Sequence, residues 1–210
     1  MTDLLIIRHG ENEYTRTGKL AGWTPEVHLN ERGLAQAQAI GQHLAKAPLK
    51  AIYSSPLERA LETAAPLAKA KKLRVHKLEG VGEVRYGDWT GKSLKVLGRT
   101  KLWGTVQRFP ASMEFPGGET FRAVQSRAVD ALDGLRQRHP KDLIAVFSHG
   151  DVIKLILAHY LGMPIDLFQR IAINTGSISV IHLTGGMPLV FKFNELPPMP
   201  PVPKAAPQPK

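Results

Sequence analysis

Short apolar runs alternate with segments of helical periodicity along this sequence, and this alternation restricts the possible folds more than any other feature. Runs dominated by aliphatic and aromatic residues lie at 4–7, 51–53, 143–147, 178–181 and 190–193. Their length and composition are typical of strands buried inside a sheet. Apolar residues recur with helical spacing over 34–44, 57–68 and 121–135. The alternation predicts right-handed βαβ units, and therefore a three-layer α/β/α sandwich with a mainly parallel central sheet.

Two helix ends are marked by their residues. The sequence Ser-Pro-Leu-Glu at 55–58 has the pattern of a capping box with proline at the first helical position. It predicts a helix start there and places Arg59 in the first turn. Gly162, with a proline two residues later, predicts the end of a helix that begins near Asp151.

The domain organisation follows from composition along the chain. Residues 84–118 are rich in Gly, Trp and Phe and show only brief helical spacing, which predicts a small cap insertion over the edge of the sheet. We therefore expect one domain over residues 1–196. Residues 197–210 are dominated by proline, and this predicts a disordered, polyproline-like tail. The tail could dock on a partner, but an inert tail is the simpler interpretation.

Composition excludes several kinds of chemistry. The chain has no cysteine, which rules out thiolate nucleophiles, disulfides and zinc sites built on sulfur. Its formal charge is +10, but the basic residues are scattered and no nucleic-acid-binding signature accompanies them, so a phosphorylated small molecule is the better partner. Neither a secretory leader nor a bilayer-spanning run is recognisable, and we expect a soluble, cytoplasmic protein without membrane contacts.

Two of the predicted strands end in the dipeptide His-Gly. The run at 4–7 leads through Arg8 into His9, and the run at 143–147 leads through a serine into His149. Because ligands of open parallel sheets bind at the carboxyl ends of strands, we expect both imidazoles in one crevice. The glycine after each histidine allows a sharp turn and a close approach to a ligand. A single histidine at a strand end is more often a structural residue, but two in equivalent positions favour a functional site.

An arginine occupies a third strand end. Arg59 follows the run at 51–53 and the predicted helix start. A lone arginine there is usually a surface ion-pair partner. Together with Arg8, however, it could hold a tetrahedral dianion through charge-assisted hydrogen bonds, and such a pocket would need no metal.

With these residues the chain resembles a known family, the histidine phosphatases, also called the phosphoglycerate mutase-like superfamily. Six segments carry the resemblance over most of the chain, in the order of the family's motifs. They are Arg8-His9-Gly10-Glu11; Leu29-Asn30-Glu31-Arg32-Gly33 with Gln36-Ala37; Ser54-Ser55-Pro56-Leu57-Glu58-Arg59-Ala60 with Glu62-Thr63-Ala64; Gly82-Glu83 with Gly87, Trp89 and Gly91; Pro116-Gly117-Gly118-Glu119-Thr120; and Ser148-His149-Gly150. The chain looks most like a subgroup known as probable phosphomutases and broad phosphatases.

The resemblance implies a role for each polar residue of the motifs. His9 would attack phosphorus and carry a phosphohistidine. Arg8, Arg59 and His149 would bind the phosphoryl oxygens and stabilise their charge in the transition state. Glu83 would protonate the leaving oxygen and then deprotonate the incoming water. The alternative for Glu83 is a loop glutamate that pairs with Arg85. No metal or other cofactor is implied.

The sequence departs from the family at the substrate pocket. Asn12 and Thr15 stand where many members carry Thr and Asn, respectively. Both residues offer hydrogen-bonding groups, and we predict that they bind the phosphate. The usual polar pattern after Gly22 is replaced by a segment that begins with Trp23. This places Gly22 at the mouth of the predicted pocket, where we expect it to contact substrate.

The predicted function is hydrolysis of small organic phosphate monoesters without a metal. A phosphomutase is the alternative, because it uses the same phosphohistidine and differs only in the acceptor. The segment from Arg85 to Gly118 is short for a glycolytic mutase and is rich in aromatic residues, which favours a phosphatase with a partly apolar cap. A catalytically inactive phosphate-binding scaffold is a third hypothesis, and retention of all five catalytic residues argues against it. Edge strands near Ile178 and Val190 make a homodimer conceivable.

Overall fold

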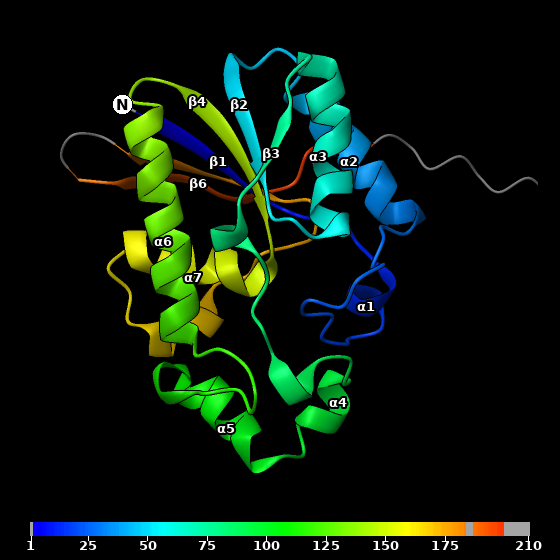
Figure 1. Cartoon of the computed structure of the whole chain (residues 1–210), viewed down its shortest axis with the longest axis vertical. Coiled ribbons are helices and arrows are strands. Elements are labelled where there is room, and N and C mark those ends of the chain that lie inside the picture. Colours follow the sequence, from blue (N-terminus) through cyan, green and yellow to red (C-terminus); the bar gives the residue numbers. More distant parts are fainter. Residues whose placement is uncertain (1, 184–186, 200–210) are drawn as a thin grey trace, which may run out of the picture.

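The computed structural model describes residues 2–183 and 187–199, and within them it has one six-stranded sheet (Figure 1). The strands are β1 (Thr2–Arg8), β2 (Leu49–Ser54), β3 (Val75–Lys77), β4 (Leu143–Ser148), β5 (Ile178–Leu183) and β6 (Leu189–Glu195), in the order β3-β2-β4-β1-β5-β6. Strands β1 to β4 pair in parallel, whereas β5 pairs antiparallel with β1 and β6 antiparallel with β5. The predicted α/β fold with a mainly parallel sheet is confirmed.

Two details of the sheet differ from the sequence predictions. Ile178 lies in β5, which is an inner strand between β1 and β6, so that only the prediction of an edge near Val190 holds. Strand β3 was not predicted, because it is three residues long and two of them are exposed. Such a strand has no apolar alternation to reveal it.

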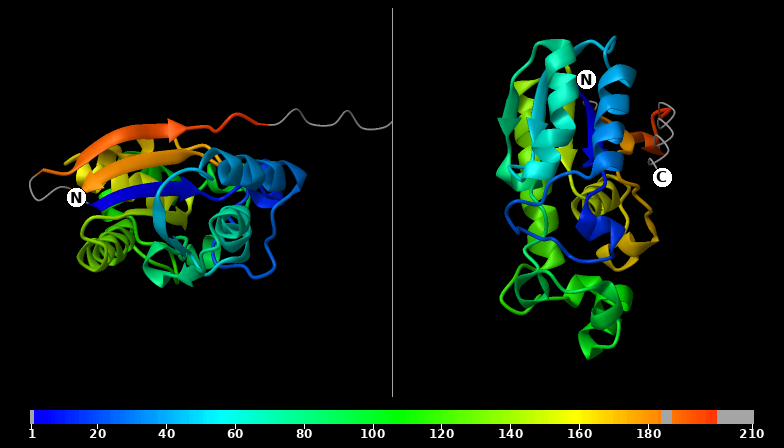
Figure 2. Two further views of the ribbon diagram at one scale, coloured as in Figure 1. Left: turned by 90° about the horizontal axis from the view of Figure 1, so that it is seen from above. Right: turned by 90° about the vertical axis from the view of Figure 1, so that its right-hand side faces the viewer.

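Helices cover both faces of the sheet (Figures 1 and 2). Helices α6 (Phe121–Arg138) and α7 (Gly150–Tyr160) lie on one face, and α2 (Glu31–His43) and α3 (Glu58–Lys71) lie on the other. The alternation along β4 separates the two layers of core, since Val146 packs toward the first layer and Phe147 toward the second. Both side chains are fully buried. Each such burial contributes about 1.5–3 kcal/mol, which explains why β4 lacks polar residues until its carboxyl end.

The helix ends agree with the sequence only in part. Helix α7 ends as predicted, with Gly162 in the left-handed region at φ 64°. Helix α3 begins at Glu58 and places Arg59 in its first turn, but Ser55 does not cap it; the N-cap residue is Leu57, whose side chain makes no capping bond. The predicted capping box is wrong, because the Ser55 hydroxyl contacts Nε2 of His149 and the backbone N–H of Leu57 rather than that of Glu58.

Short helices gather beyond the carboxyl ends of the parallel strands (Figure 1). The segment from 84 to 118 contains η2 (Gly87–Trp89), α4 (Leu94–Leu97), α5 (Lys101–Arg108) and η3 (Pro110–Ser112). Most of its aromatic residues pack on one another, with Trp89 and Phe115 almost fully buried and their ring centroids 5.3 Å apart, whereas Phe109 is exposed. The remaining short helices are α1 (Glu13–Arg16), η1 (Glu79–Val81) and η4 (Ile165–Arg170). The cap thus stands over the sheet edge at which both His-Gly segments end.

Two further sequence predictions concern the proline-rich tail and the membrane. Most of the predicted proline-rich tail, residues 200–210, lies outside the described residues. Within the described residues, none of the helices has the length and apolar character that crossing a membrane requires.

Candidate active site

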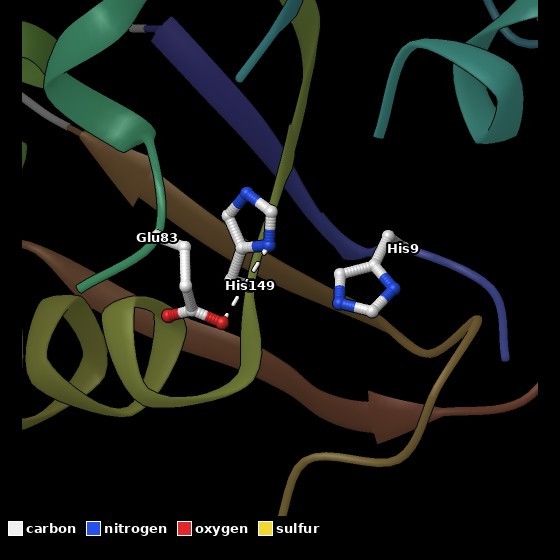
Figure 3. Close-up of side chains that lie close together, drawn as sticks. All are labelled: His9, Glu83 and His149. Carbon is white, nitrogen blue, oxygen red and sulfur yellow. Dashed lines mark ion pairs between the residues drawn. The ribbon is translucent and has the colours of Figure 1, made fainter. Parts of the chain in front are cut away.

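The two histidines of the His-Gly segments lie side by side. Strands β1 and β4 are parallel neighbours in register, with Arg8 opposite Ser148, so the residues that follow them leave the sheet at the same place. The ring centroids of His9 and His149 are 5.1 Å apart and the ring planes are inclined at 58°. Both side chains are buried, and Glu83 approaches from a separate loop (Figure 3). The structure therefore brings together the groups that the strand ends predicted.

His9 has the protonation state that a nucleophile requires. Its Nδ1 lies 2.7 Å from the carbonyl oxygen of Gly10; because a carbonyl only accepts, Nδ1 carries the proton and Nε2 keeps a free lone pair. Burial, followed by the positive charges of Arg59 and Arg8, lowers the pKa of His9 well below its usual range. The imidazole is therefore neutral at pH 7, with its nucleophilic nitrogen unprotonated.

Each of the two arginines is anchored on a backbone carbonyl. Arg8 donates through Nη1 to the carbonyl of Ile173 at 2.6 Å, and Arg59 donates through Nη2 to the carbonyl of Gly22 at 2.9 Å. One anchored nitrogen fixes the orientation of each planar guanidinium, which leaves other nitrogens directed elsewhere. Gly22 thus positions Arg59 through its carbonyl group. The backbone φ of Gly22 is 53°, in the left-handed region.

Four buried nitrogen atoms around His9 have no hydrogen-bond partner within the described residues: Arg8 Nε, Asn12 Nδ2, Arg59 Nη1 and His149 Nδ1. A buried donor left unpaired costs about 1–3 kcal/mol, so four of them at one place favour the binding of a ligand rich in acceptors. A phosphoryl group offers three oxygens and a double negative charge. Its binding would pair these donors.

His149 can act as one of these donors because Ser55 holds its other ring nitrogen. The Ser55 hydroxyl lies 2.8 Å from Nε2 of His149 and accepts a bond from the backbone N–H of Leu57 at 3.3 Å. The hydroxyl proton is free to be donated to Nε2, and in that tautomer the imidazole proton lies on Nδ1. Burial lowers the pKa of His149 well below its usual range, so the ring stays neutral.

Asn12 and Thr15 lie in the wall of the same cavity and cap helix α1. The Asn12 side chain accepts from the backbone N–H of Thr15 at 2.9 Å, and this leaves its Nδ2 free. The Thr15 hydroxyl donates to the carbonyl of Asn12 at 2.9 Å. Its only proton is therefore engaged, and a bond from Thr15 to phosphate would require that contact to break.

Glu83 is poised to exchange a proton. Its Oε2 lies 3.7 Å from Nδ1 of His149, and its Oε1 accepts from the backbone N–H of Val84 at 2.9 Å (Figure 3). Burial raises the pKa of Glu83 to about 7, the range in which a carboxyl serves both as acid and as base near neutral pH. Arg85 does not pair with it, because the Arg85 guanidinium lies 3.8 Å over the ring of Trp23.

Arg127, which the sequence did not single out, holds the loop that carries Glu83. From α6 its guanidinium donates to the carbonyls of Gly80 at 2.7 Å, Gly82 at 2.9 Å and Glu83 at 3.0 Å, and it makes an ion pair with Glu119 at 2.8 Å. The Pro-Gly-Gly-Glu segment that ends in Glu119 thereby contributes to the position of Glu83. Backbone carbonyls as partners leave no trace in sequence, which is why this contact was missed.

The glycines of the His-Gly segments lie close to other parts of the protein. A Cβ on Gly10 would lie 2.6 Å from the carbonyl oxygen of Gly33, and a Cβ on Gly150 would lie 3.1 Å from Cζ of Arg8. Gly10 lets the loop after β1 pack on the start of α2, and Gly150 makes room for the Arg8 guanidinium. These contacts give each glycine a structural role, and close approach to a ligand stays a prediction.

The site fits an anion better than a metal ion. His9, Glu83 and His149 offer ligand atoms within 4.8 Å of one another. Arg8 and Arg59 are close enough to lower the pKa of His9 through their charges. Two fixed positive charges oppose a divalent cation but attract a phosphate dianion.

The cavity above these residues has a volume of about 610 Å³. Cap residues such as Trp89, Trp103 and Phe115 form an apolar part of its wall, and Tyr86, Asp151 and Lys154 form a polar part. An organic group attached to the phosphate would lie between these parts.

Comparisons with known proteins agree with this geometry. A family model described as the histidine phosphatase superfamily (branch 1) matches residues 4–196. Phosphoserine phosphatase 1 of Hydrogenobacter thermophilus is 32% identical over 197 residues, which cover 92% of each chain. The metal-independent phosphoserine phosphatase of Arabidopsis thaliana is 33% identical over 189 residues, or 87% of this chain and 77% of that one.

A solved structure is similar over nearly the whole fold. It is a phosphoserine phosphatase mutant from Entamoeba histolytica in complex with phosphoserine, with a TM-score of 0.84 and 28% identity, and the match covers 92% of this chain and 97% of that one. The family match, the fold and the two facing histidines lead to one assignment. The chain belongs to the histidine phosphatase superfamily.

Proposed function

We propose that this protein hydrolyses small organic phosphate monoesters without a metal, through a phosphohistidine on His9. One observation carries the proposal: four unpaired, buried nitrogen donors surround an imidazole whose Nε2 is unprotonated. An acceptor-rich dianion bound to the donors would present its phosphorus to that nitrogen.

The first step transfers the phosphoryl group to the protein. Nε2 of His9 attacks phosphorus in line with the ester oxygen, so that the N–P bond forms as the P–O bond breaks. Glu83 gives its proton to the departing oxygen. Arg8, Arg59 and His149 hold the three remaining oxygens, whose charge they stabilise during the transfer.

The second step returns the protein to its starting state. Glu83, now a carboxylate, takes a proton from a water molecule, and the water oxygen attacks phosphorus as the N–P bond breaks. Inorganic phosphate leaves, and Glu83 is protonated again. A pKa of about 7 suits this alternation, because neither form of the carboxyl is strongly favoured near neutral pH.

The relatives supply a first substrate to test. Two curated relatives have names that specify phosphoserine phosphatase, and the similar solved structure holds phosphoserine. We propose O-phosphoserine as a substrate of this protein as well. A mutase would use the same phosphohistidine but pass the group to a second substrate hydroxyl, and conversion of 3-phosphoglycerate to 2-phosphoglycerate would reveal it.

The proposal is tested by hydrolysis of p-nitrophenyl phosphate and O-phosphoserine in the presence of EDTA. We expect the wild-type protein to hydrolyse both esters and His9→Ala to hydrolyse neither. His43→Ala is a matched control, because His43 is an exposed histidine at the end of α2 and its loss should change neither rate. Activity that survives in His9→Ala, or that EDTA abolishes, would refute the phosphohistidine mechanism.

We further propose that the protein is cytoplasmic and forms a homodimer. We propose that its partner is a small phosphorylated metabolite and that it binds neither nucleic acid nor membranes. The dimer is supported by β6 at the sheet edge, where Phe191 is 66% exposed and Phe193 is 46% exposed. Exposed aromatic residues on an edge strand favour association with another copy. Sedimentation velocity of the wild type and of Phe191→Ser would test it, and a monomer at micromolar concentration would contradict it.

A further inference from the structure

An ion pair lies in the wall of the active-site cavity. Asp151, in the first turn of α7, and Lys154, one turn later, lie with Oδ1 and Nζ 3.2 Å apart, and both side chains border the cavity that also borders His9 and Glu83. Tyr86 donates its hydroxyl to Oδ2 of Asp151 at 3.0 Å. The carboxylate and the ammonium are thus fixed in place beside the reacting groups.

The pair differs from the exposed ion pairs that helices carry on their surfaces. Only 22% of the Asp151 side chain and 19% of the Lys154 side chain are exposed. For comparison, the pair between Lys192 and Glu195 has the same spacing but is 48% and 37% exposed. A pair removed from water loses hydration that its own attraction repays only in part. The Tyr86 hydroxyl and the Gln169 side chain supply part of what is lost, and a charged ligand in the cavity could supply more.

A carboxylate next to a phosphate site is unfavourable for most phosphate esters. The phosphoryl group carries two negative charges, and Asp151 adds a third charge of the same sign close to Glu83, whose pKa it helps to raise. Lys154 offsets this charge for the cavity as a whole, but an anionic substituent that lies against the Asp151 carboxylate would be repelled. An ester with an ammonium group would turn the repulsion into attraction.

We propose that Asp151 and Lys154 bind the ammonium and the carboxylate of a phosphorylated α-amino acid. This inference rests on the proposed phosphatase function and assigns the amino-acid head of the substrate to these two side chains. The two charges of the zwitterion match the two charges of the pair, and the acidic residue favours esters that carry the ammonium over anionic esters that lack it. Nζ of Lys154 also lies 3.2 Å from Oε1 of Gln169. Because Gln169 is neutral, this contact does not neutralise the charge of Lys154.

The test compares substrates that differ by one group. O-phosphoserine and 3-phosphoglycerate share a carbon skeleton and a carboxylate, and a hydroxyl in the second replaces the ammonium of the first. O-phosphoethanolamine keeps the ammonium and lacks the carboxylate. We would measure kcat/KM for all three esters on the wild type, Asp151→Asn and Lys154→Met, and use the ratio between two esters on one protein sample. A ratio cancels both the folded fraction and any shared effect that reaches the reaction through Glu83.

The wild type should have a kcat/KM for O-phosphoserine that is about tenfold or more above that for 3-phosphoglycerate. This is the effect expected when the ammonium pairs with the Asp151 carboxylate in a poorly hydrated site. Asp151→Asn should bring that ratio close to one. Lys154→Met should reduce the preference for O-phosphoserine over O-phosphoethanolamine by a similar factor. The exposed pair offers matched controls, Glu195→Gln and Lys192→Met, and both ratios should stay at the wild-type values.

Two results would overturn the inference. One is a wild type that hydrolyses O-phosphoserine and 3-phosphoglycerate equally well; the other is an Asp151→Asn variant that keeps the preference. If p-nitrophenyl phosphate is still hydrolysed in a reaction that needs His9, the proposed function stands while the assignment of the amino-acid head falls. If p-nitrophenyl phosphate is not hydrolysed at all, the proposed function itself fails and the inference falls with it.

Discussion

Replacement of Glu83 by glutamine should separate the two halves of the reaction. The glutamine carbonyl can keep the 2.9 Å bond that Oε1 accepts from the backbone N–H of Val84, and the side chain stays neutral in a buried position. We therefore expect little loss of stability. The substitution removes the proton that the leaving oxygen needs, and a positioned general acid contributes about 10²–10⁴-fold to rate. This corresponds to a barrier higher by about 2.7–5.5 kcal/mol for O-phosphoserine, whose leaving group is an alkoxide.

The effect on p-nitrophenyl phosphate should differ, because p-nitrophenolate departs without protonation. Glu83→Gln should still transfer the first phosphoryl group to His9, but the discharge by water should be slow without a base. Stopped-flow absorbance should then show a burst of about one p-nitrophenolate per protein followed by slow turnover. Equal losses of kcat/KM, which reports the first step, for the aryl and alkyl esters, or the absence of a burst, would refute the assignment of Glu83 as acid and base.

Three further predictions follow from the same geometry. Because Glu83 must be protonated in the first step and has a pKa of about 7, kcat/KM for O-phosphoserine should fall as pH rises through about 7; a pH profile that rises to pH 8 and above would contradict this role. Arg127→Met removes the hydrogen bonds to the carbonyls of Gly80, Gly82 and Glu83, and each bond from a charged donor contributes about 1.5–3 kcal/mol. The melting temperature should therefore fall. Because the loop that carries Glu83 is released, the loss of kcat/KM should be larger for O-phosphoserine than for p-nitrophenyl phosphate. Arg138→Met, at the exposed end of the same helix, is its control, and equal losses on the two esters would assign Arg127 to stability alone. Gly10→Ala places a Cβ 2.6 Å from the carbonyl oxygen of Gly33 and should destabilise the fold by about 1–3 kcal/mol in denaturant titrations. Gly104→Ala is the control and should not destabilise it, because a Cβ there meets no other part of the protein within 4 Å. An unchanged midpoint for Gly10→Ala would show that the two loops separate easily.

The main elements and the centre of the site could be predicted because local patterns encode them. The run that becomes β4 is apolar at every position up to Phe147, and this identifies a strand covered on both faces. His9 and His149 could be placed together from topology alone, since parallel strands end at one edge of the sheet. The position of each histidine depends only on the strand before it.

The contacts that complete the site could not be predicted, because they join distant parts of the chain. Ser55 has the sequence pattern of a helix cap, but 94 residues separate it from the histidine that its hydroxyl contacts. Arg127 binds backbone carbonyls 44 to 47 residues away, and a carbonyl carries no residue identity. Asp151 looks like an ordinary acid in the first turn of a helix. Only the cavity beside it indicates a further role.

The most direct test of the account is to trap the phosphorylated protein. After rapid mixing of Glu83→Gln with p-nitrophenyl phosphate, the reaction would be stopped in alkali, which preserves phosphohistidine, and the peptides analysed by mass spectrometry. The account predicts one added phosphoryl group on the peptide that contains His9, lost on brief acid treatment, and absent from His9→Ala. A phosphoryl group on another residue, or full turnover of the ester without any phosphorylated protein, would contradict it.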